Sequence, residues 1–147
     1  MGINKFLSNG LILDSYDLFI DWTISEKTFL ETAKAAVFEK IIQEDFGYSG
    51  YRVESKFLKS EKKYIITFNF VKNKFTSVNI FDNEIFVNPI DKYYLMQDFL
   101  EEQIGSPSRT RNTKKEKVCV WKMNKITITH MLLDRFGLQE ILEIKIK

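Results

Sequence analysis

The chain has 147 residues, of which 44% are hydrophobic and 14% aromatic, and its formal net charge is +2 at pH 7. This length fits one domain that buries a sizeable core, and a single cysteine excludes an internal disulfide. No apolar stretch of 18 residues is present, so the sequence predicts no membrane-spanning helix, no membrane partner and a cytoplasmic location.

Charge is distributed unevenly along the chain. Residues 106–125 contain seven basic side chains and one acidic side chain. The N-terminal part is instead rich in carboxylates, at Asp14, Asp17, Asp21, Glu26 and Glu31. This polarity indicates a local basic tract on a mildly acidic body, while the small net charge by itself predicts no class of partner.

The first predicted elements lie between residues 11 and 45. Apolar triplets at 11–13 and 18–20 predict one strand or a short hairpin. Thr23 and Glu26 have the spacing of a capping box, so we expect a helix to begin there. The helix continues to about Asp45 along an apolar stripe of Phe29, Ala33, Val37 and Ile41. A break between two shorter helices over residues 35–38 is an alternative.

Three strand-like segments follow this helix. Residues 51–54, 64–71 and 75–81 alternate between apolar and polar side chains and are rich in Phe, Ile and Thr. Polar turns at 60–62 and 72–74 separate them. This pattern is typical of antiparallel strands with one packed face and one partly wet face.

A second helix begins at Asn88 and Pro89, because Asn is a strong N-cap and Pro fits the first helical position. Gly105 and Pro107 predict its end. The apolar stripe expected to face the core comprises Ile90, Tyr94, Leu95, Phe99 and Ile104. Three more strands are predicted at 118–123, 126–133 and 138–147, the last of which alternates most regularly.

The predicted order is therefore β-αβββ-αβββ, with two pseudo-repeat units at about 23–82 and 88–147. We expect a single α+β domain over residues 1–147. Its antiparallel sheet would have six or seven strands and would carry two helices on one face.

The second unit has a helix that ends in Ile104-Gly105-Ser106-Pro107 and a following strand that carries Trp121. In this it resembles the αβββ units of β-lactamase-inhibitor-type proteins and of small outer-membrane-assembly lipoproteins. The first unit has no matching Gly-x-Pro. The resemblance implies a sheet that grips another protein without catalysis. A saddle-shaped sheet of another duplicated α+β family fits the pattern equally well.

Residue types that carry chemistry are sparse. His130 is the only histidine, and no nucleophile or second acid is placed beside it by the sequence. Cys119 alternates with two valines, which is typical of a small buried hydrophobic residue. The spacing of Asp14, Asp17 and Asp21 does not match a calcium-binding loop. We therefore predict no catalytic residues, no metal site, no cofactor and no enzymatic activity.

Within this tract, the basic loop Arg109–Lys117 allows two interpretations. The cationic side chains of this loop are Arg109, Arg111, Lys114, Lys115 and Lys117. They could neutralise nucleic-acid phosphates, with aromatic residues of 64–70 as stacking platforms. A segment rich in Ser, Thr, Asn and Lys between a helix and a strand is also typical of a solvated connector. Nucleic-acid binding is thus the alternative function.

The function favoured by the sequence is binding of another protein, in the form of a bacterial toxin-neutralising (immunity) or inhibitor-type protein. Aromatic residues at the ends of elements are frequent in binding interfaces. The carboxylates near the N-terminus could add polar contacts. The candidate partner-binding residues are Trp22, Tyr48, Tyr51, Asp14, Asp17 and Asp21.

Overall fold

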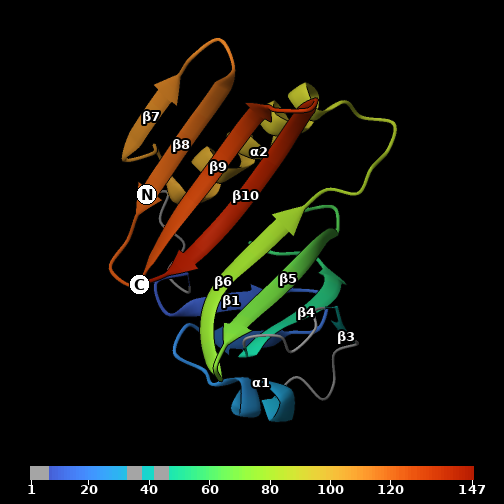
Figure 1. Ribbon diagram of the computed structural model, residues 1–147, viewed down its shortest axis with the longest axis vertical. Helices are drawn as coiled ribbons and strands as arrows, with labels where there is room; N and C mark the ends of the chain where they lie inside the picture. The colour runs from blue at the N-terminus through green and yellow to red at the C-terminus, as the bar shows by residue number, and fades with distance from the viewer. Residues whose placement is uncertain (1–6, 33–37, 42–46) are drawn as a thin grey trace.

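The computed structural model describes residues 7–32, 38–41 and 47–147. These residues form ten strands and two helices, with eight of the strands in one antiparallel sheet (Figure 1). The α+β class and the large antiparallel sheet predicted from the sequence are confirmed. The predicted number of six or seven strands and the order β-αβββ-αβββ are wrong, because each half contributes one strand more than expected and the chain begins with a separate hairpin.

Both halves of the chain supply four strands to the main sheet. The first half forms β3 (Glu39–Lys40), β4 (Tyr48–Ser55), β5 (Tyr64–Val71) and β6 (Lys74–Phe81). The second half forms β7 (Arg109–Asn112), β8 (Glu116–Lys122), β9 (Ile126–Asp134) and β10 (Leu138–Ile146). The strand order is β3-β4-β5-β6-β10-β9-β8-β7. The last strands of the two halves therefore pair at the centre of the sheet, and the first strands lie at its two edges.

A two-stranded hairpin, β1 (Gly10–Leu13) with β2 (Leu18–Asp21), lies behind the first half of the sheet (Figure 1). The sequence pattern allowed a strand or a hairpin, and the hairpin is observed. It packs as a layer of the core rather than as part of the main sheet. Leu11, Leu13 and Ile20 are buried in the hydrophobic core, and Leu13 forms an isolated bridge with Phe57.

Helices α1 (Glu26–Thr32) and α2 (Pro89–Ile104) pack on the same face of the sheet as this hairpin. The ring of Phe29 on α1 lies 5.3 Å from Phe68 between centroids, and Trp121 donates its indole N–H to the carbonyl of Gly105 at the end of α2 (2.8 Å). Phe68 and Trp121, the sheet residues in these two contacts, belong to one cross-strand row. This row comprises Phe68, Val78, Ile144, Ile128 and Trp121. Since side chains in one row share a face, both helices cover that face.

Helix α1 differs from its prediction in its cap and its length. Ser25, and not Thr23, caps it, because Ser25 Oγ accepts the N–H of Thr28 (3.1 Å) while Thr23 binds the carboxylate of Asp21. The segment predicted to stay helical to about 45 contains β3, which pairs with β4. Tertiary pairing with a strand edge thus overrides the local helical pattern there. Residues 33–37 and 42–46 lie outside the described residues.

Helix α2 begins and ends as predicted, with Asn88 as the N-cap and Gly105 as the C-cap. Its buried face is only partly the predicted one, since Ile104 is buried and Phe99 packs against the core as expected. The side chains that face the sheet are Tyr93, Met96, Gln97, Leu100 and Ile104. The predicted stripe instead leaves Ile90, Tyr94 and Leu95 exposed. Hydrophobic periodicity failed here because the polar Gln97 occupies the centre of the buried stripe.

Candidate binding surface

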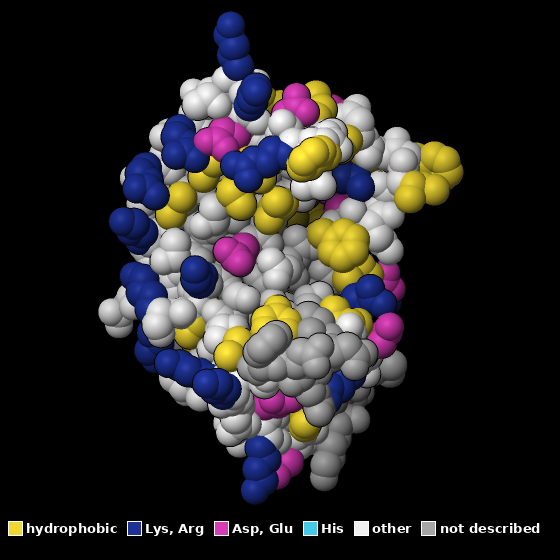
Figure 2. All heavy atoms as spheres, viewed as in Figure 1, with side chains coloured by type: hydrophobic (Ala, Val, Ile, Leu, Met, Phe, Trp, Pro, Cys, Tyr) yellow, Lys and Arg dark blue, Asp and Glu magenta, His cyan; other side chains and the backbone are white. Residues whose placement is uncertain are grey.

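The opposite face of the sheet, here called the open face, is free of the described helices and of the β1–β2 hairpin. It is the face that Figure 2 presents to the viewer. A single cross-strand row spans all eight strands and comprises Glu39, Arg52, Thr67, Asn79, Glu143, Thr129, Val120 and Arg109. The centre of the open face is therefore polar, which agrees with the alternation of the strands.

A hydrogen-bonded amide network fixes the first-half side of the open face. Asn69 is buried and donates its amide N–H₂ to Ser77 Oγ (3.0 Å) and Asn79 Oδ1 (2.8 Å). Its Oδ1 accepts the hydroxyl of Tyr48 (3.1 Å). Tyr48, a predicted partner-binding residue, thus lies on the open face and is held in one orientation. Such a satisfied network provides a rigid polar platform.

Beyond the polar row, the open face becomes apolar toward the β9–β10 turn. Ile141, Met131 and Val118 are cross-strand neighbours in one row of three strands. Each of these three side chains is half-buried. Phe81 at the end of β6 is exposed on the same face. Hydrophobic side chains accordingly gather in the upper half of Figure 2. An apolar region beside a rigid polar one is typical of a protein-binding surface.

The turn between β9 and β10 carries an aromatic ring in an unfavourable position. Phe136 is fully exposed and has a φ of 55°, in the left-handed region. Left-handed backbone costs about 1 kcal/mol for a residue with a side chain, and Asn or Gly is favoured in such turns. Neither local backbone preference nor core packing therefore explains a phenylalanine at this position.

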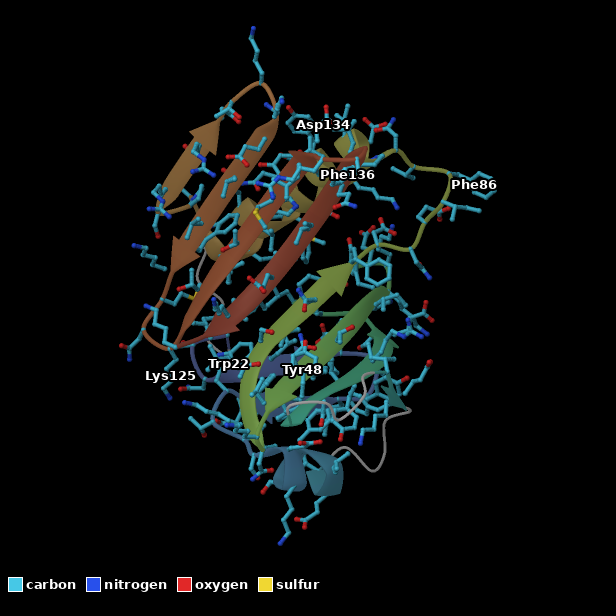
Figure 3. All side chains as sticks on the ribbon, in the orientation of Figure 1. Trp22, Tyr48, Phe86, Lys125, Asp134 and Phe136 are labelled. Atoms are coloured by element: carbon cyan, nitrogen blue, oxygen red, sulfur yellow. The ribbon has the colours of Figure 1, made fainter. Side chains whose placement is uncertain are left out.

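A second loop, residues 82–88 between β6 and α2, exposes two more large apolar side chains. Ile85 and Phe86 are 82% and 89% exposed. Figure 3 shows Phe86 and Phe136 at the same end of the molecule, with Phe86 directed outward from its loop. We call the exposed apolar side chains at this end the aromatic rim, which comprises Phe81, Ile85, Phe86, Phe136 and Leu138.

The predicted basic loop is a β-hairpin at the edge of the sheet. Its first part is β7, and its turn is closed by Thr113, which accepts the N–H of Glu116 on Oγ1 (3.1 Å). Arg109 and Arg111 lie on the open face, because they pair with Val120 and Val118. Arg111 also forms an ion pair with Glu116. Figure 2 shows Lys and Arg side chains along this edge. The segment expected as a basic loop or connector thus contains a strand that pairs with β8, and its four side chains are exposed.

The hairpin is also joined to the end of β9, just before the turn that carries Phe136. The N–H of Asp134, at the end of β9, donates to the carbonyl of Lys115 in the β7–β8 turn (2.9 Å). Lys114 and Lys115 are exposed there, whereas Lys117 lies on the helix side with its ammonium 5.9 Å from the centroid of the Tyr94 ring. Basic side chains and exposed aromatic rings thus meet at one end of the sheet.

The aromatic strand proposed as a stacking platform for bases is not accessible. Tyr64, Phe68 and Phe70 point into the core, and the last two are fully buried. Phe70 stacks on Phe75 with centroids 5.0 Å apart. The rings fill the space between the sheet, α1 and the hairpin, so this part of the nucleic-acid interpretation is wrong.

Two predicted partner-binding aromatics are also core residues. Trp22 is 1% exposed and donates its indole N–H to the carbonyl of Leu7 (2.7 Å). Tyr51 is 5% exposed and donates its hydroxyl to the carboxylate of Glu26 on α1. Their position at the ends of elements reflects packing between layers. Neither side chain is available on the surface to a partner.

The three predicted aspartates have separate local roles. Asp14 accepts the backbone N–H of Lys59 (2.7 Å). Asp17 occupies the β1–β2 turn with a φ of 51°. The hydroxyl and backbone N–H of Thr23 hold the pKa of Asp21 below its ordinary value. The three aspartates do not converge on one site. The described residues contain no group of three or more metal-binding side chains.

A buried polar cluster links α2 to β9 and β10. His130 is fully buried, with Nδ1 2.7 Å from Gln97 Oε1 and Nε2 2.6 Å from Glu140 Oε2. Gln97 donates its amide to Glu101 (2.9 Å), which fixes its oxygen toward the histidine. All groups are paired internally, so the cluster joins elements and presents no open position to a substrate.

Cys119 adjoins this cluster and is buried. Its Sγ lies 3.5 Å from the hydroxyl of Tyr93. Burial and this contact raise the pKa of the Tyr93 phenol well above its ordinary value. The cysteine therefore packs as a small hydrophobic residue with a polar neighbour, as predicted from its alternation with valines.

Neither described helix has the length and hydropathy required to cross a membrane. Comparison of the chain with known proteins finds no matching family model, no matching curated protein and no matching solved structure.

Proposed function

We propose that the protein is a non-enzymatic binding module that recognises another protein through the aromatic rim and the adjoining open face. The observation that carries this proposal is Phe136, an exposed ring on a left-handed backbone. Exposure and backbone both disfavour phenylalanine in the free protein. Burial of the ring in a partner would offset the cost of exposing it and the cost of the left-handed backbone. Aromatic anchors dominate the binding energy of many interfaces.

The specific form proposed is a cytoplasmic immunity or inhibitor-type protein that neutralises a bacterial toxin by covering part of its surface. Support comes from the resemblance of the second unit to inhibitor-type αβββ proteins. The residues that carry it, Gly105 and Trp121, join α2 to β8 through a hydrogen bond. This joint keeps the helix on one face and leaves the other face for a partner.

Site-specific photocrosslinking tests the proposal. Phe136 is replaced by p-benzoylphenylalanine in the full chain, and the cells that naturally produce the protein are irradiated. Leu30 on α1 provides the matched control, because it is also a large exposed apolar side chain but lies away from the rim. We expect one discrete protein adduct from position 136 and none from position 30. The purified partner should then bind the wild-type chain, and Phe136→Ser should weaken binding at least about tenfold.

Two results would contradict the proposal. Equal adducts from positions 136 and 30 would indicate random collision. An adduct whose purified protein binds Phe136→Ser as tightly as the wild type would show that the ring is not an anchor. The toxin-neutralising form fails separately if the partner binds but keeps its full activity in the complex.

Nucleic-acid binding remains the second candidate, and the exposed side chains of the basic hairpin favour it. Arg109, Lys114 and Lys115 are exposed, and none of them forms an ion pair with a carboxylate among the described residues that would compete with phosphate. Electrophoretic mobility shifts with a 20-residue oligo-dT and with duplex DNA at about 50 mM salt test it. Binding that falls steeply with salt and is lost in Arg109→Glu supports this candidate. Unchanged mobility of both probes excludes it.

A further inference from the structure

Strand β7 is the edge of the sheet in the second half. Among the described strands its only neighbour is β8, and all four of its side chains are exposed. Alternate backbone N–H and C=O groups of an edge strand point away from the sheet and can pair with another strand. Among the described residues the other edge, β3, comprises Glu39 and Lys40. Strand β7 therefore offers a four-residue backbone edge to a partner.

A depression lies directly beside this edge on the open face. It has a volume of about 310 Å³ and is lined by Arg109, Thr110, Arg111, Val118 and Val120. The two valines form its apolar part, and Arg109 and Arg111 are their cross-strand neighbours on β7. A peptide strand added to β7 would place every second side chain over this face. The depression is therefore positioned to receive an apolar side chain from such a strand.

The charge around the depression indicates which other side chains a peptide strand added to β7 would carry. Arg109 and Arg111 lie at its wall, Lys122 is exposed on the same face of β8, and Lys114 and Lys115 are exposed in the turn. Glu116 neutralises one guanidinium through its ion pair with Arg111. The remaining positive charge favours carboxylates on the incoming segment.

Resting on the proposed protein-binding function, we infer that β7 accepts an extended acidic segment of the partner as an added strand. One apolar side chain of this segment occupies the depression over Val118 and Val120. Its carboxylates face Arg109, Lys122 and the β7–β8 turn. Pairing of main chains supplies affinity in such complexes, and pockets for alternate side chains supply specificity.

Three observations favour a peptide over nucleic acid at this edge. The two valines of the depression are aliphatic and suit an apolar side chain of a peptide. The aromatic rings of β5 that could stack on bases are buried on the other face. Free strand-edge backbone presents alternating donors and acceptors, which match a second peptide backbone and not a uniformly anionic one.

Selection from a random decapeptide display library against the full chain tests the inference. Selection runs in parallel on the wild type, on Arg109→Glu and on Lys27→Glu. The last variant is the matched control, with the same charge change on the exposed surface of α1. We expect peptides with alternating acidic and apolar residues to be enriched on the wild type and on Lys27→Glu. Arg109→Glu should lose them, with affinity reduced at least about tenfold.

Backbone methylation of the best peptide distinguishes strand addition from charge attraction alone. N-methyl groups at one set of alternate positions remove the N–H groups that pair with β7, so binding should fall at least about tenfold. The same number of N-methyl groups at the other set should leave affinity within about threefold. A pattern that depends on position in this way supports an added strand.

Several outcomes would overturn the inference. These are no acidic enrichment, enriched peptides that bind Arg109→Glu equally well, or equal effects of both methylation sets. Oligo-dT that binds more tightly than the best peptide and loses binding in Arg109→Glu would assign the edge to nucleic acid instead. Crosslinking from Phe136 remains informative in every case, because the rim can hold a partner protein even if β7 accepts no strand.

Discussion

The phenol ring of Tyr93 on α2 lies parallel to the imidazole of His130 on β9, with centroids 4.4 Å apart and an angle of 12° between the planes. Stacking positions the imidazole so that both of its nitrogens meet oxygen atoms, of Gln97 and Glu140. Nδ1 must donate, because the amide of Gln97 is oriented by Glu101. Nε2 and Glu140 Oε2 are 2.6 Å apart, which is hydrogen-bonding distance. The helix and two strands are thus joined through the two ring nitrogens of one buried imidazole.

The first prediction concerns this buried hydrogen bond. Glu140→Gln removes the carboxylate from its contact with the buried imidazole of His130. A hydrogen bond to a charged group contributes about 1.5–3 kcal/mol, so the urea midpoint of unfolding should fall. Glu102→Gln on the exposed side of α2 is the control and should change the free energy of unfolding by less than about 0.5 kcal/mol. Equal stability of the two variants would show that the contact between Glu140 and His130 does not stabilise the fold.

A second prediction concerns alkaline pH. Burial raises the pKa of Tyr64 to about 12, with smaller contributions from the charges of Asp82 and Glu140. The folded state therefore holds this proton more tightly than the unfolded state, whose pKa is the ordinary 10.0. The resulting stabilisation is complete below pH 10 and is lost as pH rises through 12.

Tyr64→Phe has no phenol to ionise and should lose stability less steeply between pH 10 and 12. Urea titrations at several pH values measure the slope, and Tyr16→Phe serves as the control. Parallel slopes for the wild type and Tyr64→Phe would refute the assignment. Phenolate absorbance should also show Tyr64 titrating after the more exposed tyrosines.

The third prediction separates stability from binding at Phe136. Asparagine tolerates the left-handed backbone, so Phe136→Asn should raise the free energy of unfolding by about 0.5–1 kcal/mol. The same variant should lose the partner identified by crosslinking. A variant that is less stable than the wild type would mean that the ring contributes to the fold, and the case for an interface anchor would weaken.

The fourth prediction concerns the end of α2. Gly105 has a φ of 89° and a ψ of −170°, a conformation essentially confined to glycine. A Cβ at this position would meet nothing within 4 Å, so Gly105→Ala isolates the backbone term. We expect a loss of about 1–3 kcal/mol in thermal or urea unfolding. Ser106→Ala, at the exposed neighbouring residue, should be nearly neutral. A neutral Gly105→Ala would show that the helix can end differently.

Much of the fold follows from local pattern. Strands β5 and β6 and the turn at Lys72 and Asn73 were predicted, because period-two alternation and turn residues coincide there. Both residues of this turn have positive φ, as expected for a tight hairpin. The ends of α2 were predicted for a similar reason, since Asn88, Pro89 and Gly105 each suit a terminal position.

The edge strands and the orientation of α2 were not predictable in this way. Strand β7 consists of Arg, Thr, Arg and Asn, all exposed, and therefore has no alternation to detect. Gln97 is buried only because His130 lies opposite to it. The contact between Gln97 and His130 depends on how the helix sits on the sheet. A hydropathy pattern counts Gln97 as exposed and therefore misplaces the buried face of α2.

The sequence did not identify Phe86 and Phe136 as surface residues, for a related reason. Exposure of Phe86 and Phe136 depends on how the loops leave the sheet, and aromatic residues in sequence are expected to be core. One signal was available, because Phe136 precedes Gly137 in a short turn between two strands, where Asn or Asp is usual. Trp22 and Tyr51 do not occupy turn positions that favour a different residue type, and both are buried.

The junction of β6 with β10 has a consequence for how the chain acquires its structure. Within the main sheet, every other pairing joins strands that follow each other in sequence, so those contacts close short loops. Only the β6–β10 junction must wait for distant segments to meet. Amide protons of Val78, Ile80, Leu142 and Ile144 should consequently gain protection last during refolding, after each meander has already formed its own ladder.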